Sequence, residues 1–486
     1  MLDNVAQRLA EHTRENGWHE RVAFVADRRE WTFAEVFDGA ARVANGYRAA
    51  GLRPGDRVLL ALPDSVELVW CLLGAWQAGV VAVPVNVQMS REDLERDAAT
   101  AEPALAVVDP ETAGWLDTAG LVRTTRAEHL SAAEPATDFA AGGDAPALAL
   151  FTSGTTGTPK LCFFLHRDIG KPRGTEGVGV VGFSVSRMYF FGGLSASTLA
   201  TLETGLTSVL SRPRATPAAA IELMRTHGVT RFFGQPSFFA RLLLEPDHAE
   251  VLGALRVAIC AGEALSQRLR EQLVPILGAR LVNGYGATEI GGVAIGRPAD
   301  YDTPSAVGPP FQGRAVRIVD ADGQVLPTGE RGELHVRVPF ATRGVARGSL
   351  GPDQVFGTWW PTGDLGSLDE DGVVHVHGRL DDVEVIGGQN VVPGEVERLL
   401  ESHPGVLEAA VSAVRREAGY TTLRAYVVPT PDVEPDALGT ELVDLAKARL
   451  SWYKVPDDIV WLDALPRNGN GKVLRRHLRA EGNQFV

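Results

Sequence analysis

The sequence predicts an α/β protein: a large N-terminal domain of helix-covered, mainly parallel sheets with a β-rich subdomain, followed by a small α+β domain. Three observations support this. Apolar strands alternate with helical segments through residues 57–285, as in parallel sheets covered by helices. From about residue 305 the chain reads as short strands separated by turns. After residue 380 it alternates helix, strand and strand, and 486 residues are too many for one core.

The first hundred residues set the alternating pattern. Residues 1–60 predict an amphipathic helix, a hairpin turning near Asp27-Arg28, and a second helix. "RVLLAL" predicts a strand, and a helix over 65–79, the strand "VVAVPV", the helix "REDLERDAATA" and the strand "LAVVD" follow. No charged residue occurs from Leu68 to Ser90, which is long enough to span a bilayer. Its character changes midway, so a buried helix followed by a buried strand is favoured.

The remaining elements follow in order. Residues 131–145 are small and rich in Pro and Gly, which predicts a surface linker. Turns are expected at Asp322-Gly323 and Thr328-Gly329, and a domain boundary at Leu380-Asp381, which gives domains 1–380 and 381–486. Further helices are expected near 216–227, 237–244, 266–277 and 439–450.

Composition excludes some classes of function. The net charge of -14 argues against a nucleic-acid backbone as partner. The first 24 residues carry charges throughout and lack an apolar signal core. Cys71, Cys162 and Cys260 lie in apolar surroundings without metal-ligand spacing, which predicts buried reduced thiols. We therefore expect a cytoplasmic protein without a membrane or nucleic-acid partner.

A loop rich in hydroxyl groups and glycine follows the apolar strand that begins at Leu148. Its backbone N–H groups and hydroxyls can converge on an anion, and Lys160 adds a positive charge. Two residues separate Gly154 from Gly157, whereas the Walker pattern has four residues between its glycines. A flexible surface loop would not need this composition, so phosphate binding is favoured. The predicted phosphate-binding residues are Thr152, Ser153, Gly154, Thr155, Thr156, Gly157 and Lys160.

Three later segments carry polar residues in turns. In "NGYGATEIGG", Glu289 fits either a helix start or a ligand of Mg²⁺ on a nucleotide's phosphates. Asp364, in a Thr-Gly-Asp turn, can accept both ribose hydroxyls, and Arg379 can add a donor; the alternatives are turn chemistry and a surface charge. "NGNGK" is a tight turn that presents Lys472 either to an anionic site or to solvent.

Together these segments resemble the adenylate-forming superfamily of acyl- and aryl-CoA synthetases, luciferases and peptide-synthetase adenylation domains. "TSGTTGTPK", "YGATE", "TGD", "GRLDD" and "NGNGK" match its successive core motifs across essentially the whole chain. The resemblance implies a mobile C-terminal domain and a two-step reaction. A carboxylate attacks the α-phosphate of ATP, giving an acyl-adenylate and pyrophosphate, and a thiol, usually of CoA, then attacks the acyl carbon.

The resemblance also implies residue roles. Thr288 would contact the α-phosphate, Glu289 the Mg²⁺, and Lys472 would bridge the acyl carboxylate and the phosphate. Asp381 matches the hinge about which the small domain rotates, and Gly387 and Gly388 would then line the thiol tunnel. The expected adenine- and ribose-binding residues are Gly262, Glu263, Tyr285, Gly286, Asp364 and Arg379.

Within the superfamily, the segments 186–197, 228–243 and 255–265 look most like benzoate-type aryl-CoA ligases. Gly192 stands where peptide-synthetase domains place an aspartate for the substrate's α-amino group, which disfavours an amino acid. A flat apolar slot for the acid is expected from Phe190, Phe191, Gly192, Gly193, Phe233, Ala261 and Gly284, although for each aromatic alone core packing is the commoner role.

Some positions depart from the family pattern. Leu161 stands where glycine is usual, and Gln235 lies in the gate region, where other residues are common. Val385, preceded by Glu384, stands where lysine is usual, although some aryl-CoA ligases also lack that lysine. The last change lies on the thiol side and leaves the acceptor open. We predict a ligase that uses ATP, Mg²⁺ and CoA on a small aromatic or similar apolar acid. The alternatives are transfer to an acyl or peptidyl carrier protein or to an amine or nitrite, and a nucleotide-binding protein without turnover.

Overall fold

An eight-stranded sheet forms the centre of the N-terminal part. The computed structural model describes residues 3–110, 112–113, 122–152, 160–311, 314–337, 343–345, 359–382, 384–386, 389–416, 421–431, 433–467, 473–475 and 477–478. The strand order is β14-β13-β12-β11-β9-β10-β1-β2. The inner strands pair in parallel, and the pairs β1–β2 and β13–β14 at the two ends are antiparallel. Its strands are β1 (Val22–Ala26), β2 (Arg29–Thr32), β9 (Val181–Ser184), β10 (Thr207–Val209), β11 (Arg231–Gly234), β12 (Val257–Ala261), β13 (Leu281–Ala287) and β14 (Gly291–Gly296).

A second sheet has seven strands in the order β18-β8-β7-β4-β3-β5-β6. Pairing is parallel from β7 to β6 and antiparallel at β7–β8 and β8–β18. The predicted, mainly parallel architecture is therefore confirmed. The strands are β3 (Arg57–Ala61), β4 (Val81–Pro84), β5 (Leu105–Val108), β6 (Thr124–Thr125), β7 (Pro146–Thr152), β8 (Lys160–Leu165) and β18 (Arg343–Val345).

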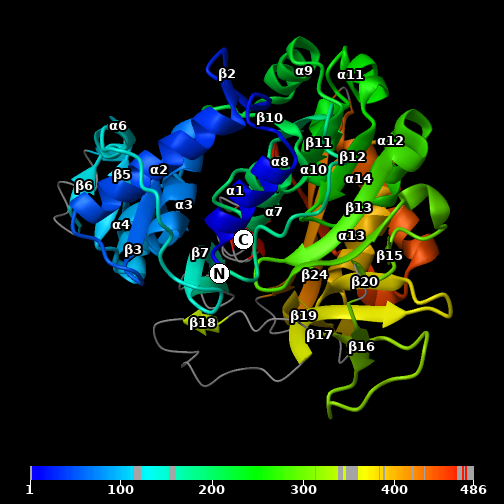
Figure 1. Ribbon diagram of the computed structural model, residues 1–486. Helices are drawn as coiled ribbons and strands as arrows, with labels where there is room; N and C mark the ends of the chain where they lie inside the picture. Colours follow the sequence, from blue (N-terminus) through cyan, green and yellow to red (C-terminus); the bar gives the residue numbers. More distant parts are fainter. Residues whose placement is uncertain are drawn as a thin grey trace.

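Helices cover both faces of these sheets (Figure 1). Along β3, Val58 and Leu60 join the core that contains α1–α3, whereas Leu59 and Ala61 face α4, as period-two alternation requires. Phe232 of β11 belongs to a third core formed with α9–α12. These helices are α1 (Val5–Glu15), α2 (Phe33–Ala49), α3 (Val66–Ala78), α4 (Arg91–Ala101), α6 (Ala127–Ser131), α9 (Pro217–Thr226), α10 (Pro236–Leu242), α11 (His248–Ala254) and α12 (Gln267–Leu277).

Local sequence signals explain several of these boundaries. Asp27 and Arg28 both have positive φ, 51° and 64°, which suits a tight two-residue hairpin, so the predicted turn is confirmed. Thr32 and Glu35 form a capping box at the start of α2. The uncharged stretch after Leu68 is helix α3 followed by strand β4, as expected. Among the described helices, none is long and apolar enough to cross a membrane.

A helical segment between β9 and β10 was not anticipated in its detail. It runs through α7 (Phe191–Leu194), a π-helical turn η1 (Ser195–Leu199) and α8 (Ala200–Thr204). The Ser197 hydroxyl donates to the Gly193 carbonyl at 2.6 Å and so occupies a backbone acceptor there. Single π turns inside helices occur often beside functional sites.

The β-rich region is a five-stranded antiparallel sheet in the order β15-β20-β19-β17-β16. Gly323 and Gly329 have φ of 78° and 88°, consistent with the two predicted turns. The strands are β15 (Ala306–Gly308), β16 (Val316–Val319), β17 (Gly332–Arg337), β19 (Trp359–Leu368) and β20 (Val374–Arg379). Short 3-10 turns η2 (Gly278–Arg280) and η3 (Pro298–Asp300) precede this region.

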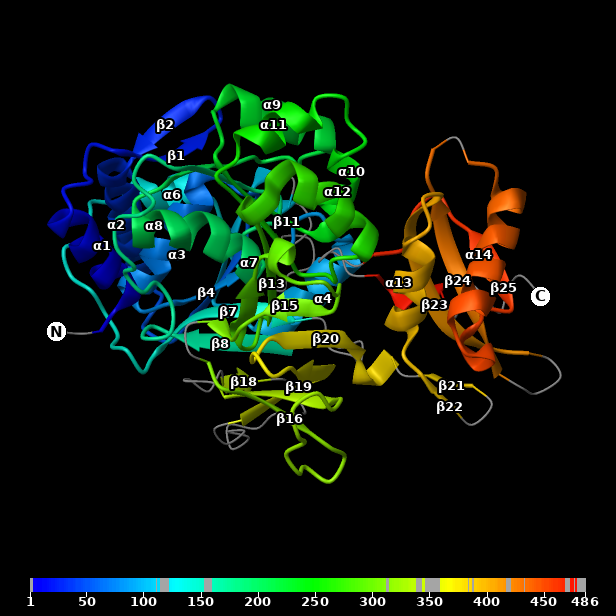
Figure 2. The same ribbon diagram turned by 90° about the vertical axis from the view of Figure 1, so that its right-hand side faces the viewer.

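The C-terminal part lies to one side of the rest (Figure 2) and has its own core, which includes Val396, Val411 and Leu442. α14 begins at Pro435 rather than near 439, because proline suits the first helical turn. The boundary at 380/381 stays a prediction; it falls in the 3-10 turn η5 (Leu380–Asp382). The remaining elements are β21 (Glu384–Ile386), β22 (Gln389–Val391), α13 (Pro393–Glu401), β23 (Val406–Arg415), β24 (Thr421–Pro429), α14 (Pro435–Arg449), η6 (Trp452–Lys454) and β25 (Asp458–Trp461).

Candidate active site

Two predicted motifs meet where the parallel strands β12 and β13 end. The segment 261–263 begins at the last residue of β12, and 285–289 spans the end of β13. Ala261 is paired with Gly284. Carboxyl ends of parallel strands share one edge of a sheet, where ligands bind in open α/β folds. Both segments line a single cavity of about 1920 Å³ that also reaches the β-rich sheet and the C-terminal part.

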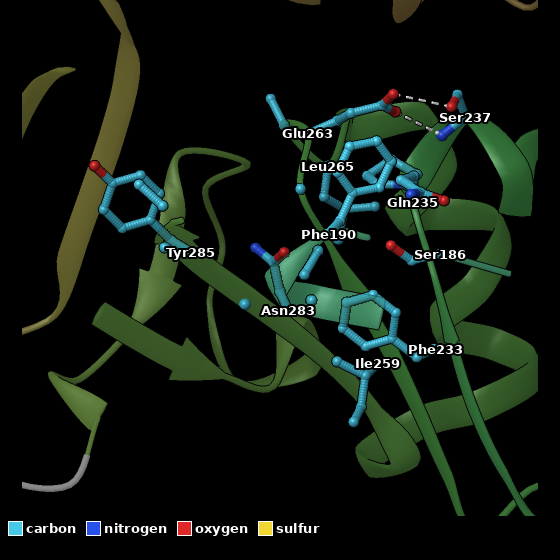
Figure 3. Close-up of a pocket in the computed structure, with 18 of the residues that line it drawn as sticks. Ser186, Phe190, Phe233, Gln235, Ser237, Ile259, Glu263, Leu265, Asn283 and Tyr285 are labelled. Carbon is cyan, nitrogen blue, oxygen red and sulfur yellow. Dashed lines mark hydrogen bonds between the residues drawn. The ribbon is translucent and has the colours of Figure 1, made fainter. Parts of the chain in front are cut away.

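Strand register separates two sides of this edge. Phe233, Ile259 and Val282 are paired in succession across β11, β12 and β13, so their side chains share one face of the sheet. Asn283 is paired with Cys260 on the other face, and Tyr285, two residues on, shares that side. Figure 3 shows Tyr285 well apart from Phe233 and Ile259, with Asn283 between them.

Asp364 and Arg379 are brought together by pairing of β19 with β20, in which they are directly opposite. Arg379 Nη1 donates to Asp364 Oδ1 at 3.1 Å and to the Thr362 carbonyl at 2.8 Å. The Tyr285 hydroxyl donates to the other carboxylate oxygen of Asp364. Burial and the Asp364 charge raise the pKa of Tyr285 well above its usual value, so the phenol stays a donor. The predicted ribose residues and the predicted adenine residue therefore form one cluster.

Glu263 occupies a central position on the first motif. Its carboxylate accepts from the Ser237 N–H at 3.0 Å and from the Ser237 hydroxyl at 3.1 Å (Figure 3). Arg467 Nη1, from the C-terminal part, donates to the same carboxylate at 2.8 Å, while Arg467 Nη2 donates to Glu408 at 2.8 Å. Sequence reasoning missed Arg467, although its position five residues before Lys472 was a usable signal.

Glycines allow close approaches at this edge. Gly262 has a φ of 96°, which favours glycine. A Cβ at Gly286 would lie 2.3 Å from the Gly291 carbonyl oxygen, so only glycine fits inside the β13–β14 hairpin. A Cβ at Gly284 would lie 3.4 Å from the Ala261 Cβ, an ordinary van der Waals contact.

The predicted acid pocket lies on the Phe233 face. Phe190, Phe191, Gly192, Phe233, Ala261 and Gly284 all line the cavity, together with Ile259 and Leu265. Phe191 also stacks on Phe164, with ring centroids 5.1 Å apart. Gly193 lies elsewhere: a Cβ there would be 2.1 Å from the Arg187 carbonyl oxygen, so this glycine packs against backbone behind the pocket wall.

The other predicted residues divide into two groups. Thr288 and Glu289 line the cavity beside Tyr285. Residues 153–159, Gly387, Gly388 and Lys472, and the side chains of Thr152, Lys160 and Asp381, lie outside what the structure describes. Leu161, where the family usually has glycine, is buried in the core with α4.

The residues present fit a magnesium ion bound mainly through a nucleotide. Among described residues no group of three His, Cys, Asp or Glu side chains is placed to cage a metal. Mg²⁺ commonly takes one or two carboxylates and completes its shell with phosphate oxygens and water. Glu289, which lines the cavity beside Thr288, offers one carboxylate for that mode.

Comparison with known protein families identifies the family of this chain. The model of the AMP-binding enzyme family matches residues 11–348, and that of the AMP-binding enzyme C-terminal domain matches residues 395–472. The chain belongs to the AMP-binding enzyme family. The resemblance inferred from the motifs is thereby confirmed.

Individual relatives of this AMP-binding enzyme differ in acid and acceptor. It is 37% identical to the p-hydroxybenzoic acid–AMP ligase FadD22 of Mycobacterium tuberculosis, over 98% of this chain and 69% of that protein. It is 30% identical to the fatty acid–[acyl-carrier-protein] ligase ScoC of Streptomyces coeruleorubidus, over 97% and 96%. The crystal structure of a benzoate CoA ligase from Burkholderia xenovorans LB400 superposes with a TM-score of 0.86 at 28% identity, over 98% and 99%.

Arg467→Met should loosen the contact between the two parts of this AMP-binding enzyme, because it leaves two partly buried carboxylates, Glu263 and Glu408, without their shared cation. We expect amide hydrogen exchange in 234–242, which contains the Ser237 donor, to quicken at least about fivefold.

Arg416→Met is the matched control, because Arg416 is bound to Asp458 within the C-terminal sheet. It should leave exchange in 234–242 unchanged. Equal exchange in the wild type and Arg467→Met would contradict the bridging role.

Proposed function

We propose that the protein activates a small aromatic carboxylic acid with ATP as an acyl-adenylate and then transfers the acyl group to CoA. The observation that carries this proposal is the strand register at one edge of the sheet. It places a polar cluster around Asp364 and Tyr285 on one side and the apolar face of Phe233 and Ile259 on the other, within one cavity. A nucleotide and an apolar acid can thus meet there.

In this proposal the polar cluster holds the nucleoside. Asp364 accepts the ribose hydroxyls. Two contacts fix the orientation of its carboxylate: Arg379 Nη1 donates to one oxygen at 3.1 Å, and the Tyr285 hydroxyl donates to the other. The adenine lies against Tyr285 and the 261–263 backbone. Asn283 is buried and shares the Tyr285 face, so its amide is placed to pair with the base edge.

The phosphates lie between this cluster and the acid. Residues 152–160 bind the β- and γ-phosphates, and Thr288 contacts the α-phosphate. Mg²⁺ held by Glu289 and phosphate oxygens would neutralise phosphate charge when bound. A carboxylate oxygen of the acid attacks the α-phosphorus while the bond to the bridging oxygen breaks and pyrophosphate leaves. Lys472 would stabilise the charge that develops in this step.

The acid pocket favours a planar apolar group. Phe190, Phe233 and Ile259 form its sides (Figure 3). A Cβ at Gly192 would lie 3.2 Å from the Phe233 ring, so glycine keeps the slot open. The relatives that act on p-hydroxybenzoate and benzoate support an aromatic acid.

The second half-reaction requires the small domain, residues 381–486, to rotate about Asp381. Rotation would remove Lys472 and bring Gly387 and Gly388 to the thiol tunnel. The Arg467–Glu263 ion pair would have to break in that motion, because it joins the two parts, whereas Arg467 and Glu408 both lie in the small domain. The Glu384 carboxylate accepts from the Ala413 N–H at 3.4 Å within the small domain.

The proposal is tested by ATP–pyrophosphate exchange with benzoates, fatty acids and amino acids. We expect exchange with benzoates at rates at least about tenfold above those for amino acids, because the pocket lacks a carboxylate at Gly192. Exchange driven only by amino acids would refute the aromatic assignment. Nucleotide binding without exchange for any acid would refute adenylation.

A carrier protein is the second candidate acceptor, favoured by the relationship to ScoC. Supplying the adenylated acid with CoA or with a phosphopantetheinylated carrier separates the two. We expect acyl-CoA to form faster; a thioester found only on the carrier, or an amide with a supplied amine, would overturn CoA as the acceptor.

A further inference from the structure

The acid side of the cavity continues past the aromatic slot. The segment α7–η1–α8 lies over the Phe233 face, and its lining residues extend from Gly192 through Ala196 and Ala200 to Glu203. The eleven steps from Gly192 to Glu203 correspond to about 16 Å at the rise of an α-helix. The small side chains Ala196 and Ala200 keep the space between helix and sheet open.

Arg231 lies on this face of the sheet. It is two residues before Phe233 in β11 and therefore shares its face, roughly 6.6 Å nearer the amino end of the strand. It is paired with Val257 just as Phe233 is paired with Ile259, and both Arg231 and Val257 line the cavity. The acid's carboxylate must face Thr288 at the carboxyl end, so the acid's other end points toward Arg231.

Within the described part of the chain, no neighbouring carboxylate balances the charge of Arg231. Arg231 Nη1 donates to the Ala196 carbonyl at 2.8 Å, which uses one of five guanidinium N–H donors. Among described residues no carboxylate forms an ion pair with it; nearby Glu203 is instead bound by Arg173 at 2.9 Å. Burial and the charge of Arg173 lower the pKa of Arg231 to about 10, yet it stays charged at neutral pH.

A largely buried cation facing a cavity without a counter-charge is costly unless a ligand supplies an acceptor. We propose that Arg231 is a specificity-determining residue that binds a hydrogen-bond acceptor or negative charge at the end of the acid remote from its carboxyl group, such as a phenolic hydroxyl or a second carboxylate. This inference rests on the proposed function and narrows its substrate class.

The test compares acids of nearly equal shape in ATP–pyrophosphate exchange. 4-Hydroxybenzoate is compared with 4-methylbenzoate, and 4-hydroxycinnamate with 4-methylcinnamate, so that both a short and a longer acid are sampled. For the wild type we expect kcat/KM to be at least about tenfold higher for the hydroxyl acid than for the methyl acid in one of the two pairs. A ratio of this size is what one charge-assisted hydrogen bond is expected to give. Terephthalate, with its second carboxylate, should also exceed 4-methylbenzoate.

Arg231→Met should reduce that preference to less than about threefold while leaving exchange with the methyl acid within about threefold of wild type. Arg231→Lys should restore part of the preference. Arg225→Met, at an arginine exposed on α9, is the matched control and should leave it intact.

The inference would be overturned if the wild type showed no preference for the acceptor-bearing acids, or if Arg231→Met kept the wild-type preference. An equal loss of exchange for all acids in Arg231→Met would also overturn it, because Arg231 would then only anchor η1 through the Ala196 carbonyl. If circular dichroism shows that Arg231→Met does not fold, the test rests on the preference of the wild type for acceptor-bearing acids and on the partial preference expected of Arg231→Lys. Absence of exchange with every acid would instead refute the proposed function itself.

Discussion

The parallel, in-register pairing of β11, β12 and β13 is the constraint on which the site depends. Side chains alternate between the two faces of a strand, so register alone assigns Phe233 and Ile259 to one side and Asn283 and Tyr285 to the other. A slip of one residue in β13 would move Asn283 to the apolar face. The apolar slot and the Asn283–Tyr285 side of the polar cluster therefore lie on opposite faces of adjacent strands.

Much of the fold could be predicted because the chain signals it locally. Asp27-Arg28, the capping box at Thr32 and the helix-to-strand change after Leu68 all depend on residues close in sequence. The π-helical turn at Ser195–Leu199 could not be predicted, since it adds one residue to a helix without a distinctive composition. The helix expected near 439–450 begins four residues earlier, at Pro435, because proline suits the first turn of a helix.

The candidate site was predictable only where a motif marks it. Asp364, Arg379 and Tyr285 lie in separate motifs, and the structure brings their side chains into one cluster. Arg467 and Arg231 were missed for a common reason. An isolated arginine in a sequence resembles any surface charge. Only tertiary contacts show that Arg467 links Glu263 to Glu408, and that Arg231 lines the cavity with no acidic partner among the residues that the structure describes.

The central claim is that the acid's own oxygen attacks the α-phosphorus, since the apolar slot and the nucleotide cluster share one cavity. The most direct measurement uses benzoate labelled with ¹⁸O in both carboxylate oxygens, with ATP and CoA, and mass spectrometry of the products. The account predicts one ¹⁸O in AMP and one in the thioester carbonyl. Label in orthophosphate and none in AMP would show attack at the γ-phosphate and would contradict it.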